Sequence, residues 1–354
     1  MPPEAGGPDG PHDIRAITDE AHLDELLSEP SQQVVDTLER LDGDILVLGV
    51  GGKMGPTLAR MARRAADQAG STRRVIGVSR FASGAQEAAL QTHGVETIRC
   101  DLLDQDAVGR LPVAPNVVFM AGRKFGSTGA ESLTWAMNCL VPAAVCRRFE
   151  ASRIVAFSTG NVYGLTPAGR GGSRETDVPA PVGEYAMSCL GRERVFEHFS
   201  LTRGTRVATL RLNYAVEMRY GILVDLAQRV LAGQPIDLAM GYVNVIWQAD
   251  ANRMALCALA QAASPPLVVN LSGADELSVR MVTESLARAL GRPASFTGVE
   301  SPDALLSNGA RGWSLLGPPR VDVARLIEWT ADWTGRGLPT IGKPTHFESR
   351  AGDF

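Results

Sequence analysis

Short runs of Val, Ile and Leu begin just after Asp44 and alternate with amphipathic stretches as far as about residue 212. Consecutive apolar positions of this kind are typical of strands that are buried on both faces of a parallel sheet. Because the runs are separated by stretches with helical spacing, the pattern predicts a doubly wound α/β sheet. The predicted strands are residues 45–48, 74–78, 97–100, 116–120, 153–157 and 206–212.

The first 42 residues predict a helical extension to this sheet domain. After a start rich in Gly and Pro, two short helices are expected near residues 19–27 and 31–41. Ser31 follows a proline and is a candidate N-cap for the second helix. This helix should pack against the main body, because it carries an apolar stripe at helical spacing. The stripe consists of Val34, Val35, Leu38 and Leu41.

The alternation loosens further along the chain, where residues 213–242 and 267–334 predict mixed helices and short strands. We expect these pieces to form a smaller C-terminal lobe for the substrate. The lobe would be interleaved with the sheet domain, residues 43–212, which is completed by about residues 243–266. Residues 335–354 are rich in Gly, Pro and charge and predict a tail. A length of 354 residues agrees with two domains of ordinary size.

Composition and charge exclude several classes of protein. With 35 Lys+Arg against 39 Asp+Glu, the net charge of −4 gives no general attraction to nucleic acids or anionic membranes. No apolar run approaches the roughly 18 residues of a membrane span, and the N-terminus does not resemble a signal peptide. Five widely spaced cysteines without a CxxC motif predict reduced thiols, and no metal-ligand cluster is evident. We therefore expect a cytoplasmic protein that holds no metal and has neither nucleic-acid nor membrane partners.

The first predicted strand leads directly into a glycine-rich turn. Gly49, Gly52 and Gly55 follow a GxxGxxG pattern, and a helix is predicted over residues 56–69. Glycines allow a sharp turn and a close approach of backbone N–H groups to a pyrophosphate, while the helix N-terminus supplies partial positive charge. The strand before the turn and the helix after it favour a dinucleotide site over a turn that is merely tight.

The end of the second predicted strand bears on the choice of dinucleotide. Sites for NAD usually carry Asp or Glu there to bind the ribose, but this chain has Ser79 and Arg80. A hydroxyl and a guanidinium suit a 2′-phosphate, and Lys53 in the glycine turn could add a second cation. NADP is therefore favoured, with NAD as the alternative. In the other interpretation, Arg80 stacks on the adenine and Lys53 is solvated.

Two further motifs lie downstream. Residues 157–164 read Phe-Ser-Thr-Gly-Asn-Val-Tyr-Gly at the end of a predicted strand, and residues 184–189 read Glu-Tyr-Ala-Met-Ser-Cys at the start of a helix. With the glycine turn and Asp250, they resemble the extended short-chain dehydrogenase/reductase family, of the NAD-dependent epimerase/dehydratase type. The resemblance covers about residues 43–334. It implies a Rossmann fold, hydride transfer by a nicotinamide cofactor, a carbohydrate-like substrate and a homodimer.

The resemblance also implies roles for individual residues. Tyr185 corresponds to the acid/base, Thr159 to the hydroxyl that orients a substrate oxygen, and Lys124 to a lysine that contacts the cofactor. The residues expected at the dinucleotide are Gly49, Gly51, Gly52, Lys53, Met54, Gly55, Ser79, Arg80, Asp101, Leu102, Ala121, Gly122, Lys124, Asn138, Ser158, Tyr185 and Cys189. Those expected in the substrate cleft are Asn161, Arg211 and Asn213.

The sequence departs from the family pattern at Cys189. The family places a lysine four residues after its tyrosine, on the same helix face. The cation lowers the tyrosine pKa from its usual value of about 10, and a neutral thiol cannot. Tyr185 is therefore a doubtful general base near neutral pH.

Three interpretations remain open. Another cation, Lys124 or Arg192, could replace the missing lysine. Tyr185 could act as a neutral hydrogen-bond donor. Alternatively, the protein could bind a dinucleotide without turnover, as a sensor or subunit. A nucleophilic role for Cys189 is less favoured than that of a small residue packed behind the cofactor.

The substrate class is only outlined by the sequence. Residues 240–247 lack the arginine that commonly binds the diphosphate of nucleotide sugars in the family. This favours an unactivated sugar, a sugar acid or another polyol, with a nucleotide-sugar epimerase or dehydratase as a further alternative. The overall hypothesis is an NAD(P)-dependent oxidoreductase or epimerase that acts on a carbohydrate hydroxyl. His346, in the tail, would gain a role only if the tail folds over the cleft.

Overall fold

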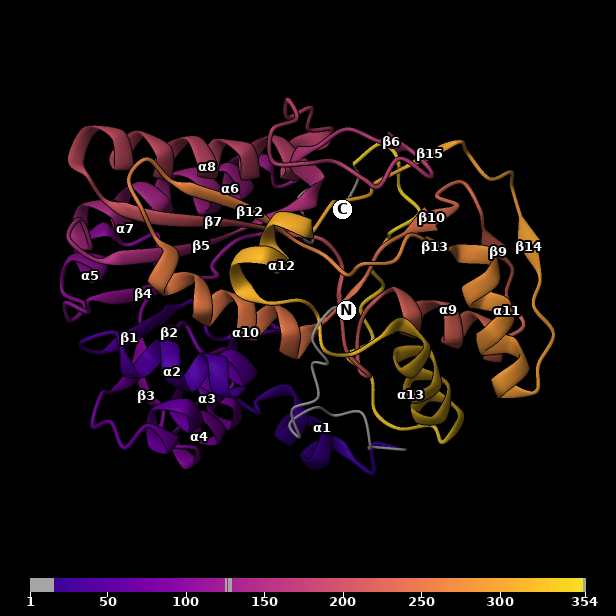
Figure 1. The fold of residues 1–354 in the computed structure, drawn as a ribbon, viewed down its shortest axis with the longest axis horizontal. Helices are drawn as coiled ribbons and strands as arrows, with labels where there is room; N and C mark the ends of the chain where they lie inside the picture. The colour runs from indigo at the N-terminus through magenta and orange to yellow at the C-terminus, as the bar shows by residue number, and fades with distance from the viewer. Residues whose placement is uncertain (1–15, 125, 127–128, 353–354) are drawn as a thin grey trace, which may run out of the picture.

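A computed structural model describes residues 16–124, 126 and 129–352. Seven parallel strands form one central sheet in the order β12-β7-β5-β4-β1-β2-β3 (Figure 1). The strands are β1 (Ile45–Leu48), β2 (Val75–Ser79), β3 (Glu96–Arg99), β4 (Asn116–Phe119), β5 (Arg153–Thr159), β7 (Arg206–Leu212) and β12 (Leu267–Leu271). The predicted doubly wound parallel sheet is confirmed.

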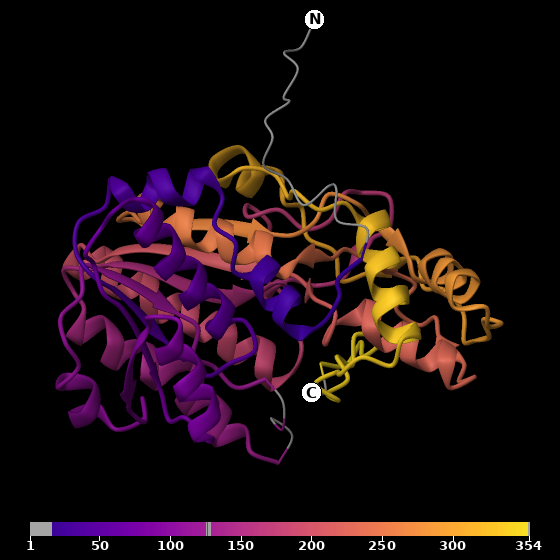
Figure 2. The same ribbon diagram turned by 90° about the horizontal axis from the view of Figure 1, so that it is seen from below.

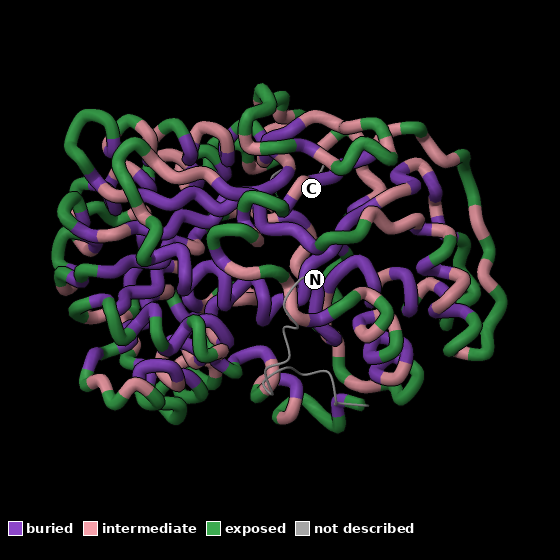
Figure 3. The backbone as a smooth tube through the Cα atoms, in the orientation of Figure 1, coloured by how far each residue is buried: buried purple, intermediate pink, exposed green. Residues whose placement is uncertain are grey.

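Helices cover both faces of this sheet, which explains its consecutive apolar residues. In β1, Ile45 and Val47 pack into one hydrophobic cluster, while Leu46 and Leu48 pack into another on the opposite face. Figure 3 shows the central strands as buried, whereas the edge strand β3 has no buried residue. The first face carries α3 (Gly55–Gln68), α4 (Gly84–Thr92) and α10 (Gln248–Ala258), and the second carries α5 (Gln105–Gly109), α7 (Val141–Arg148) and α8 (Gly183–Arg203).

The N-terminal extension contains two short helices, as the sequence predicts. They are α1 (Glu20–Leu27) and α2 (Gln32–Glu39), and α2 packs on α3 and α10. The apolar stripe of α2 is buried, with Val34 and Leu38 fully inaccessible. Ser31 occupies the N-cap position, but its side chain makes no capping hydrogen bond. The extension is therefore attached by apolar packing rather than by its cap.

The smaller lobe is built around three helices that pack on one another (Figure 1, right). They are α9 (Ile222–Leu231), α11 (Val279–Leu290) and α13 (Val323–Gly335). Short strand pairs complete this half of the molecule, namely β10 (Tyr242–Val243) with β13 (Leu277–Ser278), β11 (Ile246–Trp247) with β8 (Ala215–Val216), β14 (Phe296–Thr297) with β9 (Ile236–Asp237), and β15 (Asp303–Ala304) with β6 (Thr166–Pro167). The remaining helices are α6 (Glu131–Trp135), η2 (Ala136–Leu140), η3 (Gly160–Val162), η4 (Leu259–Gln261) and α12 (Ala310–Leu316).

Residues 267–271 correct the predicted domain boundary. The sequence pattern assigned them to the smaller lobe, but they form β12, the edge strand of the central sheet. Leu267 pairs with Ala208, and Leu271 pairs with Leu212, both in parallel register. A short apolar run identifies a strand but not its partner, and α10 is the crossover that returns the chain to the sheet.

The C-terminal segment is attached to the body of the protein rather than extending from it as a tail. Phe347 is only 1% exposed, and the Arg350 guanidinium bonds to Asp303. Figure 2 shows the last residues, in yellow, between the sheet domain and the smaller lobe. The helices in the described part of the chain include none with the length and apolar character of a membrane span.

Candidate active site

A cavity of about 350 Å³ lies where the carboxyl ends of β1, β4, β5 and β7 meet the smaller lobe. Ligands of open α/β sheets bind in this crevice. One wall comes from the sheet domain and includes the glycine turn, Tyr185 and Thr159. The other wall consists of the segment from Tyr214 to Ile222 at the start of the smaller lobe, together with Thr345 of the C-terminal segment.

The glycine turn has the geometry that a dinucleotide pyrophosphate requires. Gly49 has a φ of +87°, and a Cβ there would lie 2.6 Å from the backbone nitrogen of Ala121. A Cβ on Gly55 would lie 2.3 Å from the carbonyl oxygen of Val50, so this glycine allows α3 to begin directly against the turn. Met54 and Gly55, at the N-terminus of α3, line the cavity. The residues present therefore fit the group that the sequence predicts.

The other residues expected at the dinucleotide fall into two groups. Lys53, Gly122, Lys124 and Ser158 line the cavity with the glycine turn. The second group lies outside it, at the ends of β2, β3 and β4, where Arg80 and Asp101 are exposed, Ser79 is half-buried, and Leu102 and Ala121 are buried. A second cavity of about 450 Å³ begins at Gly51, Gly52 and Lys53 and extends toward α4. Lys53 thus stands where the two cavities meet.

Tyr185 lies in the first turn of α8 and faces the end of β5. Thr159, the last residue of β5, forms a hydrogen bond with Tyr185 and donates another to Asn161 Oδ1 at 2.8 Å. Burial raises the pKa of Tyr185, as does Cys189, and the influences of Arg192 and Thr159 only partly oppose this. Tyr185 is therefore a neutral phenol near pH 7, suited to donating a proton rather than removing one.

Cys189 and Asn138 lie behind Tyr185 and do not line the cavity. For Cys189 this agrees with the favoured role of a small residue packed behind the cofactor, whereas Asn138 was expected at the dinucleotide itself. Asn138 donates hydrogen bonds to Ser188 Oγ at 2.8 Å and to Cys189 Sγ at 3.9 Å. Burial raises the pKa of the Cys189 thiol, so this residue is neutral and a poor nucleophile. Asn138 belongs to η2, a π-helical turn of the kind that often occurs at functional sites.

Arg192 brings a buried positive charge to this region. Its guanidinium donates one hydrogen bond to the carbonyl oxygen of Phe157 at 2.8 Å and another to Asn138 Oδ1. The side chain is 6% exposed and lines the cavity. Its charge lowers the pKa values of both Tyr185 and Cys189, although burial outweighs this effect.

Lys124 supplies a second cation near Tyr185. Its Nζ lies 5.7 Å from the centroid of the Tyr185 ring. Burial lowers the pKa of Lys124 to about 8, and the neighbouring Cys189 opposes this shift. Lys124 is therefore predominantly charged at neutral pH. The two cations considered from the sequence, Lys124 and Arg192, both lie beside the tyrosine that lacks its lysine partner.

The residues expected to bind substrate are only partly brought together. Asn161 and Asn213 line the cavity. Arg211 does not; it is buried beneath the cavity and forms an ion pair with Glu193, with Nη2 2.7 Å from Oε2. Its Nη1 also donates to Tyr163 Oη at 2.6 Å. The expectation that Arg211 contacts substrate is corrected, because these bonds direct its guanidinium into the core.

The sequence analysis missed the residues that the smaller lobe and the C-terminal segment contribute. Lys53 Nζ lies 3.0 Å from the centroid of the Tyr220 ring, a cation–π contact across the cavity. Burial and the like charges of Lys124 and Lys343 lower the pKa of Lys53 to about 7. Tyr220, Gly221 and Thr345 all line the cavity, whereas His346 is exposed.

Residues 45–267 match the profile of a family described as "NAD dependent epimerase/dehydratase family". The chain belongs to this family. The match confirms the resemblance seen in the sequence motifs. No curated protein sequence matches the chain.

Solved structures of epimerases and dehydratases share the fold. UDP-glucose 4-epimerase of Thermus thermophilus, in complex with NAD, is 23% identical, with a TM-score of 0.67 over 83% of this chain and 99% of that one. UDP-glucuronic acid 4-epimerase of Bacillus cereus, in complex with NAD, is 19% identical, with a TM-score of 0.68 and the same coverage. The dTDP-glucose 4,6-dehydratase DesIV of Streptomyces venezuelae is 20% identical, with a TM-score of 0.69 over 83% and 97%.

The coverage also shows how much of this chain lies outside the shared fold. Those structures are covered almost completely, whereas about one sixth of this chain has no counterpart in them. Residues 1–42 and 335–354 make up a similar share, 62 of 354 residues.

Proposed function

We propose that this protein is an oxidoreductase or epimerase that uses a nicotinamide dinucleotide and acts on a hydroxyl of a small carbohydrate-like substrate. The observation that carries the proposal is the hydrogen-bonded pair of Tyr185 and Thr159, facing a cavity whose wall includes the glycine turn. A bound dinucleotide would supply or accept the hydride at the substrate carbon. The glycine turn, Gly122 and Ser158 would hold it.

Tyr185 performs the proton step of this reaction. In the direction of carbonyl reduction, its phenol O–H bond breaks and the proton passes to the substrate oxygen, which becomes the hydroxyl. The tyrosinate left behind would be stabilised by the charge of Arg192 and by Thr159, whose O–H would turn from Asn161 to the tyrosinate oxygen. We expect Lys124, whose Nζ lies 5.7 Å from the ring centroid, to contribute as well. The raised pKa of Tyr185 favours this direction, because the residue holds its proton until the substrate is in place.

A second candidate function is dinucleotide binding without turnover. The observation that favours it is the same pKa, which burial and Cys189 raise. A tyrosine that cannot give up its proton would leave an intact cofactor site with no acid/base. The two functions differ in what Tyr185 does, and not in how the dinucleotide binds.

Restoring the family lysine separates the two functions. Wild type, Cys189→Lys and Tyr185→Phe would be incubated with sugars, sugar acids and NAD(P), and cofactor reduction or oxidation would be followed by absorbance. Activity in the wild type that disappears in Tyr185→Phe supports the enzyme. Tight cofactor binding without turnover in either wild type or Cys189→Lys supports the binding protein.

We further propose that NADP is preferred over NAD. Ser79 and the exposed Arg80 stand at the end of β2, where no carboxylate would repel a 2′-phosphate. NADPH should therefore bind more tightly than NADH, and Arg80→Ala should remove most of the difference. Equal affinities of the wild type for both, measured by calorimetric titration, would contradict this preference.

A further inference from the structure

Helix α1 of the N-terminal extension is bonded to both halves of the molecule. On the sheet domain it packs on α3 and α10, with Leu23 and Leu27 fully buried. Arg64 of α3 donates from Nη1 to Ser28 Oγ at 3.1 Å and to the carbonyl oxygen of Glu25 at 2.9 Å. Apolar packing and these bonds together fix α1 to the sheet domain.

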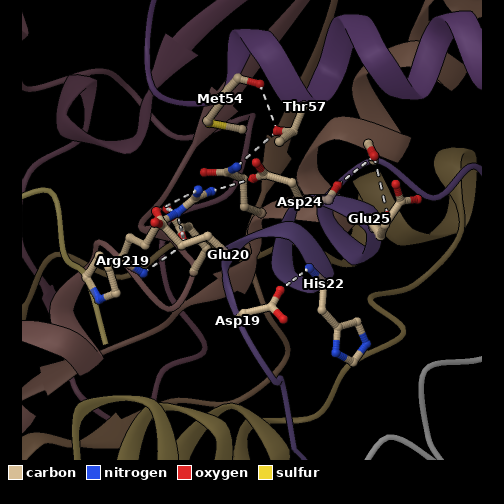
Figure 4. Close-up of polar contacts among 12 residues, drawn as sticks. Asp19, Glu20, His22, Asp24, Glu25, Met54, Thr57 and Arg219 are labelled. Carbon is tan, nitrogen blue, oxygen red and sulfur yellow. Dashed lines mark hydrogen bonds and ion pairs between the residues drawn. The ribbon is translucent and has the colours of Figure 1, made fainter. Parts of the chain in front are cut away.

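The same helix is bonded to the smaller lobe. Figure 4 shows Arg219 reaching toward α1, with Nη2 2.8 Å from Asp24 Oδ1 and Nη1 3.7 Å from Glu20 Oε1. Arg336, which directly follows α13, donates to the carbonyl oxygen of Thr18 at 2.9 Å. The N-terminal extension therefore connects the smaller lobe to the sheet domain.

Arg219 is also bonded to the C-terminal segment. The backbone N–H of Ile341 donates to the carbonyl oxygen of Arg219 at 2.9 Å. Further along, the backbone N–H and hydroxyl of Thr345 donate to Asp225 Oδ2 in α9 at 2.7 and 2.6 Å. One terminal segment thus binds the side chain of Arg219, and the other binds its backbone. The family profile matches residues 45–267, so both terminal segments lie outside the matched part of the chain.

Arg219 lies in a tight turn that ends at Tyr220. The backbone N–H groups of Glu217 and Tyr220 donate to each other's carbonyl oxygens, at 3.0 and 3.1 Å. The buried Glu217 carboxylate accepts from the backbone N–H of Arg219 at 2.8 Å and pairs with its guanidinium at 3.2 Å. Because these bonds make the turn one unit, a displacement of the Arg219 side chain should displace Tyr220 as well.

Tyr220, unlike Arg219, lines the cavity between the sheet domain and the smaller lobe. Lys53 Nζ lies 3.0 Å from the centroid of the Tyr220 ring. Lys53 belongs to the glycine turn, between Gly52 and Gly55, where the residues fit a dinucleotide. The cation–π contact therefore links the turn expected to hold the cofactor with the wall that the terminal segments hold.

We propose that Arg219 is a positioning residue, through which the two terminal segments hold the Tyr220 ring over Lys53 and so raise the affinity of the cavity for the dinucleotide. The effect on affinity rests on the proposed function, whereas the position of the ring does not. A wall that is already in place loses less conformational freedom when a ligand binds, which makes binding tighter. Only 18% of the Arg219 side chain is exposed, and ion pairs that are partly buried contribute more than fully exposed ones.

The position of the ring can be measured on the full chain without any ligand. The chain has five tyrosines, so protein labelled with 3-fluorotyrosine gives a simple fluorine NMR spectrum, in which Tyr220→Phe identifies the Tyr220 resonance. Asp24→Asn and Arg219→Met should each shift this resonance, because the ring moves away from the ammonium of Lys53. The resonance of Tyr163, which is buried in the core, should stay in place.

Two control variants show whether the shift depends on the Arg219 contact. Asp36→Asn removes the same charge from the same extension, but Asp36 is exposed on α2 and bonds to Gln32 within its own helix. It should leave the Tyr220 resonance unchanged. Arg219→Lys keeps the charge without the planar fork that reaches two carboxylates, so it should shift the resonance less than Arg219→Met does.

Affinity for the dinucleotide is measured by calorimetric titration with NADPH and NADH. Asp24→Asn and Arg219→Met should each raise Kd about 3- to 10-fold. The double variant should bind no more weakly than Arg219→Met alone, because both changes break the same contact. Additive losses of affinity would show that Asp24 acts by another route and would overturn the inference.

The results separate the positioning role from the proposed function. If the wild type binds neither dinucleotide, the proposed function fails, and the Tyr220 resonance alone decides whether Arg219 positions the ring. A resonance that stays in place in Asp24→Asn or Arg219→Met, or that moves equally in Asp36→Asn, would overturn the positioning role. Dinucleotide affinities that are the same in the wild type and in both variants would overturn it too.

Discussion

The cavity contains two pairs of a tyrosine and a lysine: Tyr185 and Lys124 both lie on the sheet-domain wall, whereas Lys53 reaches from that wall to Tyr220 on the other. Lys124 Nζ lies 5.7 Å from the ring centroid of Tyr185, whose hydroxyl bonds to Thr159. Lys53 Nζ lies directly over the Tyr220 ring at 3.0 Å. Lys124 thus lies beside its tyrosine, whereas Lys53 makes a close cation–π contact with its own. Under the proposed function, we expect the first pair to serve proton transfer and the second to serve binding.

The two walls also differ in how they are assembled. Tyr185 is placed by α8 and β5, elements of the sheet domain that the family shares. The segment around Tyr220 is placed by Arg219, which contacts both α1 and the C-terminal segment. Both walls lie mainly within the residues that match the family, but only the second is tied to the two terminal segments, and it includes Thr345 from one of them. We expect the second wall to determine which substrate is accepted.

Replacing each tyrosine in turn should give the largest difference in kcat between the two walls. Tyr185→Phe removes the proton donor, and we expect kcat to fall by about 100- to 10,000-fold. Tyr220→Phe keeps the ring beneath Lys53 and should lower kcat far less. Steady-state rates with a saturating cofactor measure both. Similar falls in kcat in the two variants would contradict separate roles for the two tyrosines, with proton transfer at Tyr185 and binding at Tyr220.

Lys124 should control the pH dependence of the first wall. Its pKa of about 8 means that the ammonium is lost as pH rises through that value. Since the charge stabilises the tyrosinate, kcat should fall on the alkaline side. Lys124→Met should lower kcat about 10- to 100-fold and remove this alkaline limb, while Lys124→Arg should move it to higher pH. A pH–rate profile that is the same in Lys124→Met and the wild type would assign stabilisation of the tyrosinate to Arg192 alone.

Arg219 should affect the second wall without affecting proton transfer. Arg219→Ala breaks the contacts with Asp24 and Glu217, and we expect KM to rise about 3- to 10-fold, from the loss of one partly buried ion pair, with a smaller change in kcat. Arg194→Ala is the control, because the Arg194–Glu197 pair is exposed and should contribute little. A fall in kcat with unchanged KM would contradict the division between the walls.

The smallest expected effect concerns stability. The pKa of Lys53 lies near 7 in the folded protein but near its ordinary value of 10.5 when unfolded. Between these values the unfolded chain binds more protons, so this lysine makes the free energy of unfolding rise with pH. Lys53→Met should flatten that rise, as the difference in melting temperature between about pH 7 and pH 9 would show. The lowered pKa of Lys124 makes the free energy of unfolding rise with pH in the same way. Because Lys124 is still present in Lys53→Met, part of the rise should remain in that variant.

Much of the sheet domain could be predicted from local patterns. The run at residues 45–48 matches β1 residue for residue, and the predicted limits of β7 agree with the structure. Gly49 and Gly55 were identified by their spacing in the turn, and the structure shows close contacts at both. Apolar runs, helical spacing and the spacing of the glycines are all patterns within a few consecutive residues, which is why the sequence reveals them. The predicted homodimer and cytoplasmic location stay predictions.

The sequence by itself determined the parallel sheet, the glycine turn, the two motifs that carry Thr159 and Tyr185, and the cysteine where the family has lysine. Only the tertiary structure decided that β12 completes the sheet, that Arg211 turns to Glu193 inside the core, and that Lys53 lies over the Tyr220 ring. Each of these depends on a partner far along the chain. Local sequence spacing cannot identify such a partner, because packing and charge bring the two residues together only when the chain has folded.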